Sequence, residues 1–132
     1  LLFSYHGLPK SSLDSGDPYY CYCQKTSRLV AQQLSLSENK HKTVFQSRFG
    51  PSQWLKPYAE ETLIQLAKSG IQEIDIIAPS FSVDCLETLD EIKREYQEVF
   101  EEHGGKKIKY IPALNDSRDA IKLISNIIEE HL

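Results

Sequence analysis

Short apolar runs alternate along the chain with longer stretches in which apolar residues recur every three or four positions. The short runs predict β-strands at residues 1–6, 43–49, 72–78 and 107–112. A helical pattern follows each of them. The resulting βαβαβαβα order predicts one parallel sheet of four strands with helices on both faces, a three-layer α/β/α fold of the Rossmann-like or flavodoxin-like type.

Proline and other capping residues indicate where the helices begin. Asp17-Pro18 supplies an N-cap and a first-turn proline for the first helix, and Pro57 begins the second. The third is expected from about Asp84 to His103, and the fourth after Asn115-Asp116. The residues expected on the apolar faces of the four helices, in chain order, are Leu29, Val30 and Leu34; Leu63, Ile64, Leu66 and Ala67; Leu89, Ile92, Tyr96, Val99 and Phe100; and Ile121, Ile124, Ile127 and Ile128.

Composition and charge narrow the class of protein. A chain of 132 residues suffices for a single domain with one core, and a net charge of −4 argues against duplex nucleic acid as a partner. No apolar run approaches the ~20 residues that cross a bilayer. Three cysteines are too few for a disulfide scaffold, which favours a reducing, cytoplasmic compartment. The chain lacks methionine and opens on an apparent buried strand, so we expect an excised piece of a longer protein.

Candidate chemistry is expected just after the strands, because parallel sheets bind ligands at the carboxyl ends of their strands. His6 ends the first strand there, and it is either a structural residue or a group that accepts a proton or binds a metal. Glu87, Glu91 and Glu95 recur at every fourth position of the third helix, a row that suits a hard divalent cation. The same row lies opposite the apolar stripe of the helix, so the alternative is that these glutamates form a solvated face. Both interpretations hold together if a π-bulge widens the helix, or if part of that face lines a water-filled channel.

Other motifs carry less weight. The first strand is followed by neither G-x-G-x-x-G nor a P-loop, so the phosphate-binding loop of a dinucleotide or nucleotide site is excluded there. Cys21-x-Cys23 without a second pair is more typical of ordinary thiols than of a zinc or iron–sulfur site. Trp54, the only tryptophan, is equally compatible with a packing role and with a flat ligand.

Three strings together resemble one family. They are Phe3-Ser4-Tyr5-His6-Gly7-Leu8-Pro9, Gln46-Ser47-Arg48-Phe49-Gly50-Pro51 with Trp54-Leu55, and Pro79-Ser80-Phe81-Ser82-Val83-Asp84-Cys85-Leu86-Glu87-Thr88-Leu89. In this order they resemble the motifs of ferrochelatase, the enzyme that inserts ferrous iron into a porphyrin to complete haem. The resemblance covers essentially the whole chain. It implies a chelatase-like lobe, residues 1–132, equivalent to the carboxyl-terminal half of the family's chain, with the amino-terminal lobe absent.

The resemblance also implies roles for individual residues. His6 and Glu87 match the catalytic pair, with His6 acting as proton acceptor or metal ligand. Glu91 and Glu95 extend from Glu87 at positions where the family is proposed to pass metal inward, so all four residues are candidate metal ligands. The residues implied in porphyrin binding are Gln46, Ser47, Trp54 and Phe81.

The implied partners are a porphyrin, most simply protoporphyrin IX although coproporphyrin stays open, and Fe²⁺ as a substrate. No permanently bound cofactor is expected, and Cys21 and Cys23 do not make a complete [2Fe-2S] ligand set. Without the amino-terminal lobe the fragment is expected to be weakly active or inactive. A metal- or tetrapyrrole-binding module of the same fold, and a cobalt or nickel chelatase, are the alternative functions. A third alternative is a purely structural α/β lobe.

Overall fold

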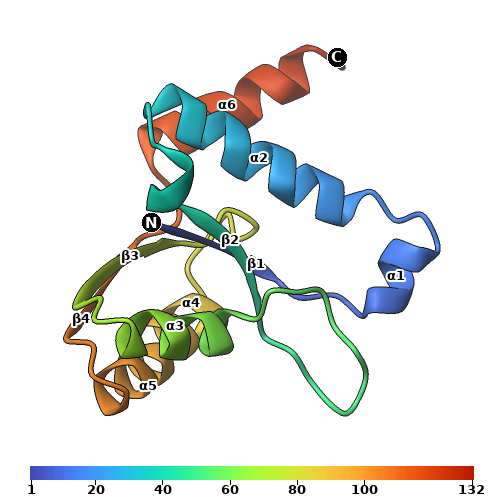
Figure 1. Cartoon of the computed structure of the whole chain (residues 1–132). Helices are drawn as coiled ribbons and strands as arrows, with labels where there is room; N and C mark the ends of the chain where they lie inside the picture. The colour runs from blue at the N-terminus through green and yellow to red at the C-terminus, as the bar shows by residue number, and fades with distance from the viewer.

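A computed structural model describes all 132 residues and contains one four-stranded sheet (Figure 1). The strands are β1 (Leu2–His6), β2 (Lys42–Gln46), β3 (Glu73–Ile77) and β4 (Lys107–Ile111), arranged in the order β2-β1-β3-β4. All neighbouring strands pair in parallel. The predicted three-layer α/β/α fold is therefore confirmed, with the second strand ending at Gln46, before the Phe49 that was expected.

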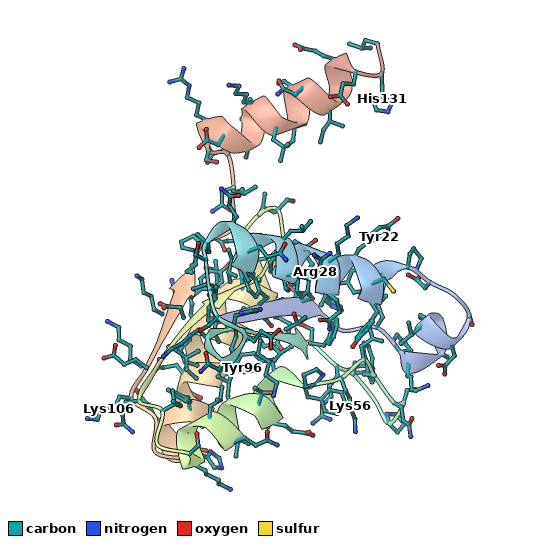
Figure 2. The ribbon with its side chains drawn as sticks, turned by 45° about the horizontal axis from the view of Figure 1, so that its top comes forward. Tyr22, Arg28, Lys56, Tyr96, Lys106 and His131 are labelled. Atoms are coloured by element: carbon teal, nitrogen blue, oxygen red, sulfur yellow. The ribbon has the colours of Figure 1, made fainter.

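Helices lie on both faces of the sheet (Figure 1). Helix α2 (Tyr19–Gln33) covers one face, with α6 (Arg118–Glu129) farther out on the same side (Figure 2), and the other face is covered by α3 (Ala59–Lys68), α4 (Leu86–Leu89) and α5 (Gln97–Glu102). The connections contain α1 (Lys10–Asp14) and a 3₁₀ turn (Glu38–Lys40). No helix has both the length and the apolar character that crossing a membrane requires.

Alternation along β1 divides the core into two parts, because successive side chains of a strand point to opposite faces. Leu2 packs with Leu63 and Phe100 on the α3 and α5 side, whereas Phe3 and Tyr5 pack on the α2 side. Every one of these five side chains is buried. The sheet is thus fixed from both faces, and the carboxyl end of β1 is held firmly between them.

The apolar face predicted for α2 is wrong. Leu29, Val30 and Leu34 are exposed, and the helix instead buries Cys23 and Ala31 together with Ser27. These buried positions are spaced by four residues, so they lie on one face. Their small side chains bring the helix close to the aromatic residues of β1 and β2, a contact that a search for large apolar residues does not detect.

The predicted third helix is interrupted. Residues Glu91–Tyr96 form a π-helical segment between α4 and α5. The widened turn changes the angular register, so Leu89 is exposed although it was expected on the core face with Ile92 and Phe100, which are both buried. The π-bulge that the sequence left open is confirmed.

Helix α6 exists where it was predicted but contacts the rest of the molecule little. In Figure 2 it stands apart from the body, connected by an extended segment. Its isoleucines are 51–55% exposed, and Ala120 is its one buried residue.

Candidate functional site

The loops that follow β1, β2 and β3 meet at one end of the sheet, where His6 ends β1. The Gly7 N–H donates to the Gln46 carbonyl at 2.8 Å, which continues the pairing with β2 by one residue. On the other side, the His6 N–H donates to Ser80 Oγ at 3.0 Å. His6 is therefore held between β2 and the loop after β3, at the edge where ligands bind in parallel sheets.

The His6 ring has a defined tautomer. Its Nδ1 lies 2.7 Å from the Gly7 carbonyl oxygen, and a carbonyl can only accept, so Nδ1 carries the proton. In the neutral ring Nε2 then has a free lone pair. The Phe81 ring lies beside the imidazole, with centroids 6.0 Å apart. His6 is partly exposed, and with Nδ1 as the donor, Nε2 is the ring nitrogen that can accept a proton or bind a metal.

Trp54 packs against the backbone that follows His6. A Cβ added at Gly7 would lie 3.1 Å from the indole ring and 2.8 Å from the Gln46 carbonyl oxygen, so only glycine fits this position. The indole Nε1 donates to the Phe49 carbonyl at 3.0 Å. Of the two interpretations left open for Trp54, packing is the one seen here, and its partial exposure leaves part of the side chain accessible.

Glu87 lies in the four-residue helix α4, between Cys85 and Thr88, the two residues that form the capping box of this helix. The pKa of its carboxyl is lowered, first because the Cys85 thiol donates a hydrogen bond to it, then through its own backbone N–H and the nearby His6. Burial raises the pKa of the Cys85 thiol, which stays a donor. Glu87 is thus an ionised carboxylate within electrostatic reach of His6.

Glu91 is held by four hydrogen bonds. The Ser47 N–H donates to Oε1 at 2.7 Å and the Ser47 hydroxyl donates to Oε2. Gln46 Nε2 donates to Oε2 at 3.0 Å, and the Tyr96 hydroxyl donates to Oε1 at 2.9 Å. Ser47 has a φ of 59°, a left-handed conformation that turns both of its donors toward the carboxylate. Glu91 therefore belongs to a network at the ends of the strands and is not part of a solvated face.

The other expected site residues divide between surface and interior. Gln46 is only 2% exposed, and besides Glu91 it binds Ser4 and the Glu87 carbonyl, so it acts inside the fold. Glu95 is exposed and pairs with Arg94 at 3.1 Å. The row of glutamates is thus split between a buried network and the surface. No three His, Cys, Asp or Glu side chains lie close enough to hold a metal ion together, and the three cysteines are free.

A small cavity of about 210 Å³ opens between the network and the start of α3. Glu91, Glu95 and Tyr96 line it, together with Glu60 and Arg48, which the sequence did not indicate. Burial, and then the charge of Glu91, raise the pKa of the Tyr96 hydroxyl, so it remains a donor. A larger cavity of about 420 Å³ lies at the opposite ends of the strands, far from His6.

Asp84 also has a role that the sequence did not indicate. Its carboxylate accepts hydrogen bonds from Asn115 Nδ2 at 2.8 Å, from the Tyr110 hydroxyl at 2.7 Å and from Thr88 Oγ1 at 3.0 Å. These bonds, the one from Asn115 first, lower the pKa of Asp84 to about 2. The carboxylate ties the loop that carries Glu87 to β4 and to the turn before α6.

Comparison with known proteins places this geometry in context. The sequence model of the family described as ferrochelatase matches residues 1–132. The chain is 49% identical to ferrochelatase 2 of Shewanella oneidensis and 49% identical to the ferrochelatase of Nitrosococcus oceani. It is 50% identical to the ferrochelatase of Dechloromonas aromatica. Each match covers all 132 residues of the chain but only 36–40% of the length of the relative.

Proposed function

The chain belongs to the ferrochelatase family, and on that premise we propose that the polypeptide carrying it inserts Fe²⁺ into protoporphyrin IX, as the last stage of haem synthesis. The observation that carries the proposal is the free Nε2 of His6 beside the ionised carboxylate of Glu87, at the carboxyl ends of parallel strands. Fe²⁺ enters as a substrate, and the proposal assigns the protein no permanently bound cofactor.

The reaction requires two porphyrin N–H protons to leave while the metal exchanges water for pyrrole nitrogens. His6 Nε2 accepts one of the two pyrrole protons, because it is the ring nitrogen that has no proton when Nδ1–H is bonded to the Gly7 carbonyl, and the second proton passes to water. Glu87 balances the charge of the incoming cation and of the protonated imidazole. One Fe²⁺ replaces two protons, so the net charge of the reacting groups is unchanged.

Metal approach is assigned to the remaining carboxylates. In this proposal the cation passes from Glu95, which is exposed, to Glu91, whose carboxylate shares the Gln46 amide with the main-chain carbonyl of Glu87. Oxygen ligands of this kind suit a hydrated divalent cation that must exchange its waters one at a time. Phe81, Trp54 and Ser47 are the proposed porphyrin contacts, and Gln46 contributes by holding Glu87 and Glu91.

A second lobe is part of the proposal. The relatives are much longer than this chain, which covers 36–40% of their length. We infer that an amino-terminal lobe supplies the other wall of a porphyrin cleft. We place the whole protein in the cytoplasm.

The test is metal insertion by the full polypeptide, followed by porphyrin fluorescence or absorbance, with Fe²⁺ and with Zn²⁺. His6→Ala and Glu87→Gln are each expected to retain porphyrin binding and to lower kcat by about 100-fold or more, the range for removal of a general acid–base group. His131→Ala and Glu102→Gln, which change exposed residues remote from the site, are the matched controls.

The same assay separates the alternatives. Porphyrin binding without insertion by the unaltered polypeptide would indicate a binding module of the same fold. Faster insertion of Co²⁺ or Ni²⁺ than of Fe²⁺ would assign a different metal to the same site. Unchanged insertion in both His6→Ala and Glu87→Gln would overturn the assignment of the catalytic pair.

A further inference from the structure

Strand β1 extends farther than its neighbour β3. It pairs with β2 along its whole length, up to His6 opposite Gln46. With β3 it pairs only at Leu2 and Phe3. The N–H and C=O of one strand residue face the same neighbouring strand, so the main-chain groups of His6 that face the β3 side lie beyond the end of that strand. They need other partners, because main-chain groups that are removed from water and left unpaired are costly.

Two side chains supply these partners. Ser80, in the loop after β3, accepts the His6 N–H at 3.0 Å. Tyr19, in the first turn of α2, donates its hydroxyl to the His6 carbonyl oxygen at 2.9 Å. Tyr19 is itself fixed by its N–H, which donates to Asp17 Oδ1 at 2.8 Å. A donor and an acceptor side chain thus replace the missing strand on both main-chain groups of His6.

The Tyr19 hydroxyl is suited to this role. Burial, followed by the neighbouring Cys23, raises its pKa to about 12, so it keeps its proton and remains a donor across the physiological range. Ser80 also lies against this hydroxyl. The two side chains therefore form one connected support behind His6.

We propose that Tyr19 and Ser80 are positioning residues that fix the main chain of His6 and thereby the direction of its Nε2. Neither side chain reaches the proposed reacting nitrogen. Ser80 holds the N–H of the peptide before the His6 Cα, and Tyr19 holds the carbonyl of the peptide after it. Together they fix the backbone from which the imidazole reaches the Gly7 carbonyl through Nδ1. On the β2 side the His6–Gly7 peptide is already held, because the Gly7 N–H donates to the Gln46 carbonyl, so Tyr19 and Ser80 supply the restraint on the side that β3 does not reach. The inference deepens the proposed function and rests on it only for the effect on insertion.

The structural part of the inference is tested without any activity. Long-range ¹H–¹⁵N correlation spectra of the full polypeptide distinguish the two neutral tautomers of an imidazole, and His6→Ala assigns the signal. We expect a single Nδ1–H tautomer for His6. Tyr19→Phe and Ser80→Ala are expected to give a mixture of tautomers, whereas Ser80→Thr, which keeps the hydroxyl, restores the single form. Tyr22→Phe and Ser82→Ala, at exposed positions nearby, are the matched controls.

The catalytic part uses the same variants in the insertion assay. Loss of one hydrogen bond of ordinary strength corresponds to a fall in kcat of about three- to tenfold, with KM for the porphyrin unchanged. An unchanged His6 tautomer in both Tyr19→Phe and Ser80→Ala would overturn the inference. If the variants change the His6 tautomer but the unaltered polypeptide inserts no metal, the positioning role is supported and the proposed function is contradicted. The two failures are therefore distinguishable.

Discussion

The residues around the end of β1 differ in whether the sequence alone could identify them. His6 could be found from the sequence, because it ends an apolar run and precedes a Gly-x-Pro turn. Tyr19 and Ser80 could not, because their contacts with His6 join positions 13 and 74 residues apart. Glu91 was found for its spacing, yet its four donors come from Ser47, Gln46 and Tyr96, which no local pattern connects to it.

Asp84 gives a prediction at the same scale. Its pKa is about 2 in the folded protein, below the ordinary value near 4 in an unfolded chain, so the carboxylate stabilises the fold above about pH 4. This contribution is lost as the pH falls through 2. Asp84→Asn is expected to reduce the free energy of unfolding by about 2 kcal/mol at pH 7, the range for hydrogen bonds to a charged group.

Urea denaturation at several pH values measures this effect. The difference between the unaltered protein and Asp84→Asn should shrink as the pH is lowered from 4 toward 2. Asp116→Asn, which changes an exposed carboxylate in the same turn as Asn115, is the control and should cost little at any pH. A difference that stays constant down to pH 2 would mean that the charge of Asp84 does not stabilise the fold.

At the scale of elements, strands were easier to predict than helix faces. All four strands lie within a few residues of their predicted positions, because each is a short segment that is either mainly apolar, as in β1, or alternates apolar with polar residues, as in β3 and β4. Helix α2 was placed correctly but with the wrong face, since its contact with the sheet is made by Cys23, Ser27 and Ala31. The π-helical segment was left open by the sequence, and the structure shows that its two end residues, Glu91 and Tyr96, are hydrogen-bonded to each other.

Helix α6 provides a prediction about dynamics. A helix of 12 residues is marginal in water without tertiary contacts, and α6 buries only Ala120. In the 132-residue chain its amide hydrogens are therefore expected to exchange much faster than those of α3, which buries Leu63 and Ala67. Hydrogen exchange followed by mass spectrometry measures both helices at once. Equal protection in the two helices would show that α6 is held by contacts that this arrangement does not contain.

For the whole molecule, the alternation of strand and helix was enough to predict the layers and the parallel sheet. The order β2-β1-β3-β4 puts the ends of β1, β2 and β3 together, which is why motifs far apart in sequence form one site. The proposed amino-terminal lobe is a different matter. It rests on the length of the relatives, of which this chain covers 36–40%.

That proposal leads to a comparison of the chain with the full polypeptide. The 132-residue chain is expected to fold, with a cooperative melting transition, and to insert Zn²⁺ or Fe²⁺ at least about 100-fold more slowly than the full polypeptide, because one wall of the cleft no longer orients the porphyrin. Circular dichroism verifies folding, and porphyrin fluorescence follows insertion. Comparable rates for the two would remove the need for a second lobe.

The contact between Gly7 and β2 restricts how the site could change by mutation. Any larger residue at position 7 would place its Cβ 2.8 Å from a main-chain oxygen, at Gln46, and 3.1 Å from Trp54. Shortening Trp54 would relieve only the second clash, since the first involves no side chain. Replacing Gly7 and Trp54 together would therefore still leave the clash with the main-chain oxygen of Gln46. A library intended to alter metal or porphyrin preference should therefore keep position 7 constant and vary Phe81 and Trp54 instead.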